Sequence, residues 1–180
     1  MSLTWGFAPR WELGLDVRAS HDLSLGPQDP SVVGTGIIVK HVVRQGSVQG
    51  ATGPSLALEA DLLAPEINGA GATGASAAVI LSHAWAHATG HVTMRYVRTR
   101  ERNDSMIFNG ILEGPGRWTV RPVAELAHER DGTEPYVTSL LAGAVWTIRN
   151  DLSLDAAYRV ARVESESSLH ELRAGFTWTF

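Results

Sequence analysis

Cysteine is absent from this 180-residue chain, so neither a disulfide framework nor a thiolate metal site can form. Lysine occurs once, at Lys40, against fourteen arginines, whereas a water-covered surface usually mixes both cations with acidic residues. The net charge of −4 and the absence of a basic run argue against a nucleic-acid partner. No glycine-rich motif follows a strand pattern and opens a helix, which excludes a nucleotide-binding fingerprint.

Long apolar runs are also missing. The longest, around residues 75–81, spans about seven residues, far short of the ~18 that a membrane-spanning helix needs. Residues 1–6 lack the basic start and apolar core of a signal peptide, and they already alternate like a strand.

The sequence instead contains segments in which apolar and polar residues alternate strictly. In residues 169–180 one face would carry Leu172, Ala174, Phe176, Trp178 and Phe180, while Arg173, Gly175, Thr177 and Thr179 would lie on the other. This period of two is that of an extended strand. A strand that ends the chain on an aromatic residue is typical of the closing strand of an outer-membrane barrel.

The same alternation recurs about eleven times along the chain. We predict strands over residues 3–8, 11–18, 33–43, 55–62, 75–87, 91–100, 105–113, 118–129, 136–148, 151–162 and 169–180. The connections alternate between tight turns and longer loops, with residues 44–54 as the one exception. Pro122 predicts a local irregularity, because proline disrupts a central ladder. The pattern predicts an all-β fold, an antiparallel up-and-down transmembrane β-barrel that forms a single domain over residues 1–180.

In such a barrel the charged face lines the lumen and the apolar face meets lipid. The predicted lumen residues are Glu12, Asp16, Arg18, Lys40, Glu59, Asp61, Arg121, Glu125, Glu129, Asp155, Arg159 and Arg173, and Glu125, Arg121 and Arg159 are expected to form one cluster. They would either neutralise one another or line a polar path, and the sequence leaves both open. Aromatic residues near strand ends predict belts at the membrane interface: Trp5, Trp11, Trp118, Tyr136, Trp146, Trp178 and Phe180.

Bacterial single-chain barrels have an even number of strands, so eleven visible strands suggest a natural total of twelve. We therefore expect that an in-frame signal peptide and one more strand precede residue 1. The expected location is the bacterial outer membrane. The expected partners are the lipid bilayer and the barrel-assembly machinery, which would engage the C-terminal strand ending at Phe180.

The order of these pieces resembles the meta-pathway phenol degradation family of outer-membrane proteins, whose members are often labelled as transporters. The similar stretches are residues 3–15, residues 55–58 leading into 63–65, residues 118–129 with Val123-Ala124-Glu125-Leu126, and residues 172–180. The resemblance lies in strand and turn patterns, and it implies a passive channel or transporter for small hydrophobic or aromatic compounds. It implies neither catalytic residues nor a cofactor, so we do not expect an enzyme.

Three alternatives remain open. His83, His87 and His91 stand four apart, which on a helix would form a metal-ligand face, but the predicted strands separate them. An outer-membrane lipid-modifying hydrolase would need a serine, Ser105 or Ser139, beside His128, and no motif couples them. A soluble lipocalin-like ligand-binding barrel would turn its apolar face inward.

Overall fold

The computed structural model describes residues 2–20, 32–69, 71–132, 136–163 and 168–179. Eleven strands form one antiparallel sheet, in which every strand pairs with its neighbours in chain order. The strands are β1 (Ser2–Ala8), β2 (Trp11–Ser20), β3 (Val32–Arg44), β4 (Ser55–Leu63), β5 (Gly74–Ala84), β6 (Thr89–Arg98), β7 (Asp104–Glu113), β8 (Val120–Asp131), β9 (Val137–Arg149), β10 (Leu152–Val163) and β11 (Ser168–Trp178). The all-β, up-and-down prediction is confirmed.

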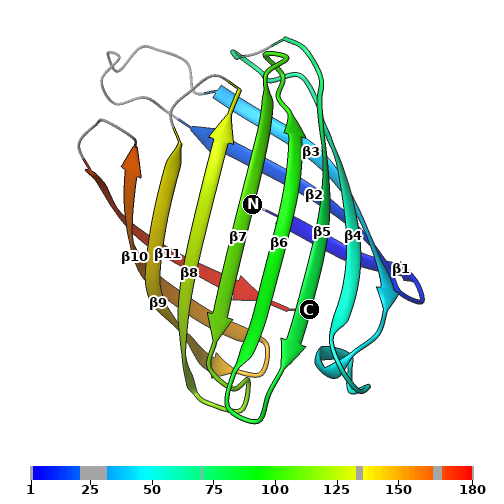
Figure 1. Ribbon diagram of the computed structural model, residues 1–180, viewed down its shortest axis with the longest axis vertical. Helices are drawn as coiled ribbons and strands as arrows, with labels where there is room; N and C mark the ends of the chain where they lie inside the picture. Colours follow the sequence, from blue (N-terminus) through cyan, green and yellow to red (C-terminus); the bar gives the residue numbers. More distant parts are fainter. Residues whose placement is uncertain (1, 21–31, 70, 133–135, 164–167, 180) are drawn as a thin grey trace.

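The sheet rolls around a central axis, with β5 to β8 in front and β1 and β11 on the far side (Figure 1). It is not closed, because the strand order starts at β1 and stops at β11 without a pairing between these two among the described residues. An odd number of antiparallel strands makes the first and the last run in the same direction. Direct closure would therefore require a parallel ladder between β1 and β11.

The two ends of the rolled sheet differ. What we call the tight-turn end carries residues 9–10, 85–88, 114–119 and 150–151, together with the longer connection 45–54. The long-loop end carries the connections that follow β2, β4, β6, β8 and β10. The predicted alternation of short and long connections is present only in part, because residues 114–119 at the tight-turn end form a longer connection than residues 99–103 at the long-loop end.

The connection 45–54 is long because it folds back onto the sheet. It contains the 3-10 helix η1 (Ser47–Gln49), and the Ser47 hydroxyl lies 3.0 Å from His83 Nδ1 and accepts the Ala84 amide at 2.8 Å. Gly46 makes this return possible, because a Cβ atom there would lie 2.4 Å from backbone atoms of Pro54 and Ser55.

Two sequence predictions about β5, β6 and β8 are wrong in detail. The turn between β5 and β6 is residues 85–88, closed by a 2.8 Å hydrogen bond from the Trp85 amide to the Ala88 carbonyl. Gly90 lies inside β6, where the Trp85 ring covers it; a Cβ on Gly90 would come within 2.9 Å of that ring. Pro122 pairs in register with Ala144, so no irregularity occurs between β8 and β9, and the ladder with β7 ends one residue away at Val123.

The described part of the chain has almost no apolar core. Its buried apolar residues are three alanines, Ala57, Ala78 and Ala161, and no large side chain is fully buried. Helix is equally scarce, and none among these residues has the length and apolar character to traverse a bilayer.

Candidate functional site

Side chains alternate between an inner face, turned toward the axis of the roll, and an outer face. The strand registers place all the described predicted lumen residues on the inner face: Glu12, Asp16, Lys40, Glu59, Asp61, Arg121, Glu125, Glu129, Asp155, Arg159 and Arg173. The strand position of Arg18 is opposite Gly34, and its side chain lies outside the described residues. The inner face is therefore the charged face of the sheet.

Arg95 of β6 is the centre of the best-connected inner cluster. Its guanidinium bonds Glu59 and Asp61 of β4 and donates to the Ser76 hydroxyl at 2.9 Å, while that hydroxyl donates to Asp61. The three charged side chains are 26%, 13% and 7% exposed in the order Arg95, Glu59, Asp61. This cluster joins three adjacent strands through charge-assisted hydrogen bonds, which are stronger than neutral ones.

A second well-connected arginine, Arg100, lies near the long-loop end of the sheet. Arg100 donates through Nε to the Ala64 carbonyl at 2.6 Å and through its terminal nitrogens to the Thr35 carbonyl and the Glu66 carboxylate, both at 3.0 Å. Its guanidinium thus bonds to two segments of the chain, β3 and the connection that follows β4.

The expected cluster of Glu125, Arg121 and Arg159 does not form as one unit. All three lie on the inner face, but each has its own partner: Asn109 donates to Glu125 at 2.9 Å, Arg121 Nε lies 3.2 Å from a Glu113 oxygen without hydrogen-bond alignment, and Arg159 lies 3.3 Å from Glu171. Neutralisation is therefore local, between neighbouring strands.

Arg95 was missed from the sequence, because apolar residues occur on both faces of its strand. The signal that could have found it is the outward pair Met94 and Tyr96, which are 52% and 45% exposed and leave Arg95 on the opposite face. Ser76 was missed for a similar reason, since the alanines beside it suit either face.

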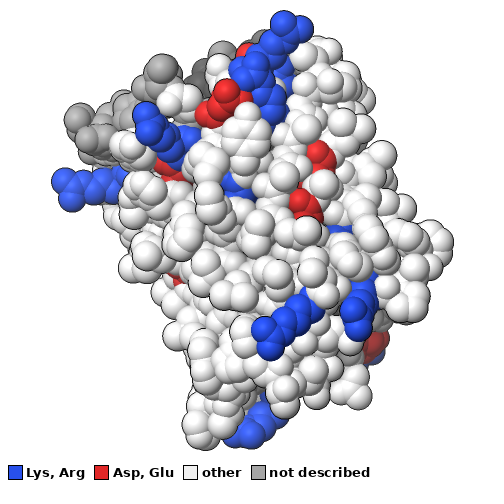
Figure 2. All heavy atoms as spheres, turned by 45° about the vertical axis from the view of Figure 1, so that its right-hand side comes forward, with Lys and Arg blue, Asp and Glu red and all other residues white. Residues whose placement is uncertain are grey.

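The outer face is apolar along its middle. Exposed large apolar side chains lie on it from β1 to β11, and none of the described outward strand positions between the two ends carries Asp, Glu, Lys or Arg. Figure 2 shows one side of the molecule, where uncharged surface predominates and charged side chains gather toward the top, with a few acidic and basic side chains nearer the middle. A continuous apolar band is far larger than the patches that monomeric soluble proteins expose.

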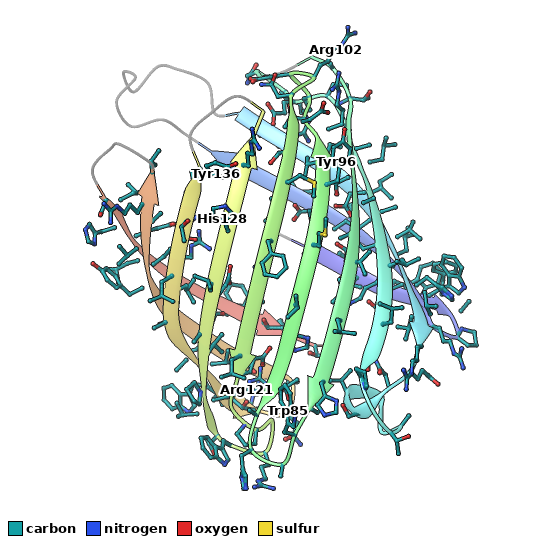
Figure 3. The ribbon with its side chains drawn as sticks, in the orientation of Figure 1. Trp85, Tyr96, Arg102, Arg121, His128 and Tyr136 are labelled. Carbon is teal, nitrogen blue, oxygen red and sulfur yellow. The ribbon has the colours of Figure 1, made fainter. Side chains whose placement is uncertain are left out.

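Aromatic residues mark both edges of this band. The tryptophans gather toward the tight-turn end and are all exposed: Trp5, Trp11, Trp85, Trp118, Trp146 and Trp178. Two tyrosines, Tyr96 and Tyr136, lie toward the long-loop end, and Tyr158 lies near the middle of β10. Figure 3 shows Trp85 at one end and Tyr96 and Tyr136 toward the other. Of the predicted interface aromatics, Phe180 lies outside the described residues.

Charged groups return to the outer face at the long-loop edge. Asp104 accepts hydrogen bonds from Tyr96 at 2.7 Å and from Arg98 at 2.6 Å. The Arg130 guanidinium lies 5.2 Å from the centre of the Tyr136 ring, which also stacks on His128 at 5.1 Å. Tyrosine here has its ring beside the apolar band and its polar partners beyond it, an arrangement suited to a boundary between an apolar and a wet region.

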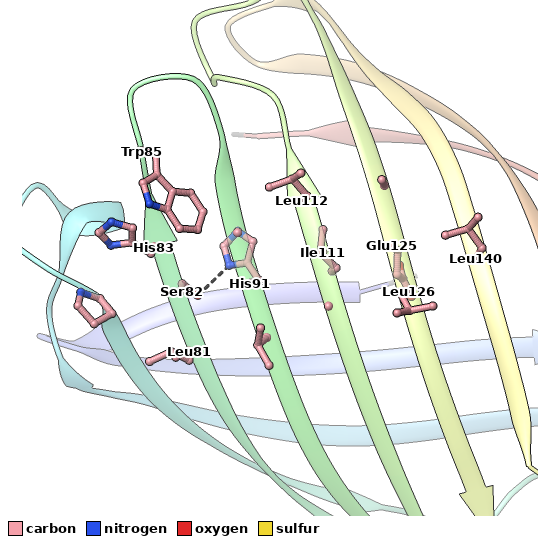
Figure 4. A pocket seen from close by; sticks show the side chains of 15 residues that line it. Leu81, Ser82, His83, Trp85, His91, Ile111, Leu112, Glu125, Leu126 and Leu140 are labelled. Carbon is pink, nitrogen blue, oxygen red and sulfur yellow. Dashed lines mark hydrogen bonds between the residues drawn. The ribbon is translucent and has the colours of Figure 1, made fainter.

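The outer wall also has an apolar hollow of about 410 Å³ near the tight-turn end (Figure 4). It forms where Gly110 presents no side chain, and Trp85, Leu112, Leu126 and Leu140 surround the gap. Its exposed lining is mostly apolar, with Ser82, His83, His91 and Glu125 also among the lining residues, so it offers mainly packing surface.

The histidines and serines weighed from the sequence are not brought together. His83 lies on the outer face beside η1, His87 lies in a turn, and His91 bonds Ser82 at 2.7 Å on the inner face. The described residues contain no group of three or more His, Cys, Asp or Glu side chains placed to hold a metal ion.

The proposed serine–histidine pair is likewise split between the two faces. His128 lies on the outer face, where its Nδ1 is 2.9 Å from the Thr138 hydroxyl. Ser105 and Ser139 lie buried on the inner face. Neither serine can therefore use His128 as a base in this arrangement.

Comparison with known proteins adds no identification. No protein-family model matches the chain, no curated protein is significantly similar to it, and no solved structure is significantly similar to its fold.

Proposed function

We propose that this chain is an outer-membrane β-barrel protein and a passive conduit for small hydrophobic or aromatic compounds. The observation that supports the membrane part best is the inversion of the two faces. Apolar side chains point away from the axis along a continuous band, and charged side chains point toward it. This is the alternation of a membrane barrel and the reverse of a lipocalin-like soluble barrel.

The near-absence of a core supports the same environment. A soluble domain of this size stabilises its fold largely by removing apolar surface from water. Here the described residues bury only three alanines among their apolar side chains. In a bilayer the acyl chains would cover the outer face, and the hydrogen-bonded ladder would satisfy the backbone.

The spacing of the aromatic residues fits a bilayer. Tyr136, immediately before β9, and Trp146, near the other end of β9, lie ten residues apart, about 33 Å along a strand at 3.3 Å per residue. At the usual barrel tilt of 35–45° this corresponds to roughly 25 Å across the membrane, the height of the apolar band in such barrels. The tight turns would lie on the periplasmic side, and the long loops would face outward.

The conduit part rests on the sequence resemblance to an outer-membrane transporter family and on space inside the roll. A cavity of about 590 Å³ lies on the inner face, within the range of small-molecule sites. Passive passage would need no catalytic group and no cofactor.

Membrane insertion is tested by refolding the full chain with and without preformed vesicles and separating the vesicles by flotation. We expect the chain to float with the vesicles and to resist extraction by high salt, because its attachment is apolar. A monodisperse protein in detergent-free buffer that stays behind when the vesicles float would refute the membrane proposal.

Passage is tested in the same vesicles by the uptake of labelled phenol or toluene against a labelled polyol of similar size. We expect faster uptake of the aromatic probes than in protein-free vesicles and little change for the polyol. Equal rates with and without protein would refute the conduit while leaving membrane insertion intact. Release of fatty acid from the vesicles would instead support a lipid hydrolase.

A further inference from the structure

The inner cavity has features that the proposed passage of neutral compounds does not use. It lies toward the long-loop half of β3 to β7 and has a volume of about 590 Å³. Its lining combines acidic, basic and apolar side chains, among them Asp16, Ile38, Asp61, Leu63, Arg95 and Arg100.

Glycines on β3 keep this cavity open. A Cβ added to Gly36 would lie 3.4 Å from the Leu63 side chain, which is ordinary contact, and one added to Gly34 would lie 3.3 Å from a Glu66 oxygen. Neither glycine has a positive φ, so neither is required by the backbone conformation. Their effect is to leave room beside the charged groups.

Asp61 presents an unused acceptor in this cavity. Its side chain is 7% exposed, and its Oδ2 atom bonds Arg95 and Ser76. The other carboxylate oxygen, Oδ1, is buried and has no hydrogen-bond partner among the described residues. A buried carboxylate oxygen without a partner loses its hydration without compensation, which a donor from a ligand would restore.

The charge around the cavity favours a positive ligand. Three carboxylates line it, those of Asp16, Asp61 and Glu66, against the guanidinium groups of Arg95 and Arg100. Both arginines are already engaged by protein acceptors.

The remaining wall is apolar, formed by Ile38, Leu63, Val97 and Ile107. A ligand that consists of an ammonium group alone would leave this apolar surface exposed to water. A ligand with a short apolar group attached to the ammonium would cover it. The two kinds of lining together specify an amphiphilic ligand, with one cationic end and one apolar end.

We propose that this cavity binds small amphiphilic organic cations, in which an ammonium group donates to Asp61 Oδ1 and an aromatic or aliphatic body packs against Ile38 and Ile107. The proposal deepens the proposed function by naming a substrate class, and it rests on that function only for the passage of the bound ligand. Equilibrium binding does not require transport, so the two ideas fail separately.

The test uses the refolded full chain in detergent and calorimetric titration with 2-phenylethylammonium. Phenylacetate, of similar shape and opposite charge, and neutral ethylbenzene are the comparison ligands. We expect the cation to bind at least tenfold more tightly than either. Equal affinity for phenylacetate, or no binding of the cation, would overturn the proposal whatever the vesicle uptake shows.

Two variants locate the site. Asp61→Asn removes the charge and should weaken cation binding about tenfold while leaving ethylbenzene unaffected, because a charge-assisted hydrogen bond is lost. Gly36→Leu adds an apolar side chain beside Leu63, fills the cavity and should weaken all binding. Its matched control is Gly110→Leu, which adds the same side chain to the outer face, where no atom lies within 4 Å of the new Cβ.

Circular dichroism and urea midpoints check that each variant folds. If Asp61→Asn does not fold, Gly36→Leu and its control decide the outcome. Unchanged cation affinity in Gly36→Leu, or an equal loss in Gly110→Leu, would show that the ligand does not occupy this cavity.

Discussion

Leu126→Arg is the substitution that tests most directly which medium surrounds the outer face. Leu126 lies near the middle of β8, is 54% exposed, and has Gly110 and Leu140 as its cross-strand neighbours. An arginine at the midplane of a barrel's lipid face destabilises it by about 3 kcal/mol. Since 1.36 kcal/mol corresponds to a factor of ten, the unfolding equilibrium should shift roughly 150-fold.

The assay is urea unfolding in vesicles, followed by tryptophan fluorescence, which should change as the tryptophans at the tight-turn end leave the interface. The slope of the free energy against urea should stay constant, so that the midpoint reports stability alone. In water the same exposed substitution would shift stability by no more than about 0.5 kcal/mol. A change of that size in vesicles would refute the membrane environment of the outer face.

The matched control is Ala127→Arg, one residue further along the same strand and on the inner face. The new guanidinium would lie between Glu125 and Glu129, its neighbours on that face, so we expect little loss of stability. If Ala127→Arg were the more damaging of the two substitutions, the assignment of the faces would be reversed.

Two further predictions concern the inner wall. Gly143→Ala should destabilise the fold by about 1–3 kcal/mol, because its Cβ would lie 2.5 Å from the Ala156 carbonyl oxygen. The control Gly110→Ala, whose Cβ meets no atom within 4 Å, should change the urea midpoint little. Equal midpoints for the two variants would contradict the close approach of β9 and β10. Arg95→Met should lower the free energy of unfolding by about 3 kcal/mol in the same assay, because it leaves the Glu59 and Asp61 carboxylates without their arginine partner. Neutralising both carboxylates in that variant, by Glu59→Gln and Asp61→Asn, should recover part of the loss. An Arg95→Met variant as stable as the parent would show that the cluster does not stabilise the fold.

Much of this architecture follows from local alternation. The predicted strands of the second half differ from the observed ones by one or two residues, as in β9 and β10, because a period of two persists over twelve or more positions there. The sequence misplaces the turn between β5 and β6, because glycine is common in turns and Gly90 follows the alternating run. Its real role, leaving room for the ring of Trp85, depends on a contact that the order of residues does not reveal.

The sequence predicts which face of the sheet each charged residue occupies, but it does not predict which charged residues pair with one another. The sequence separates Glu59 and Arg95 by 36 positions, and nothing in it states the register of β4, β5 and β6. In the structure Ala78 lies between them in one row, and its small side chain lets Arg95 reach across β5. The pairs expected around Glu125 were assigned without such a register, and the observed ones involve Asn109, Glu113 and Glu171.

The agreement of all eleven strands on one facing is a stronger argument for the environment than any single residue. A shift of one residue in a strand's register would exchange its two faces and bring charged and apolar side chains onto the same surface. Turning the whole sheet inside out would move Arg95, Glu59 and Asp61 to the outside together with their bonded partner Ser76 and would turn the apolar face into the roll, which is the arrangement of a soluble barrel. The observed facing is the opposite one, with charged side chains inside and apolar side chains outside, and it supports the proposal that the medium outside the roll is itself apolar.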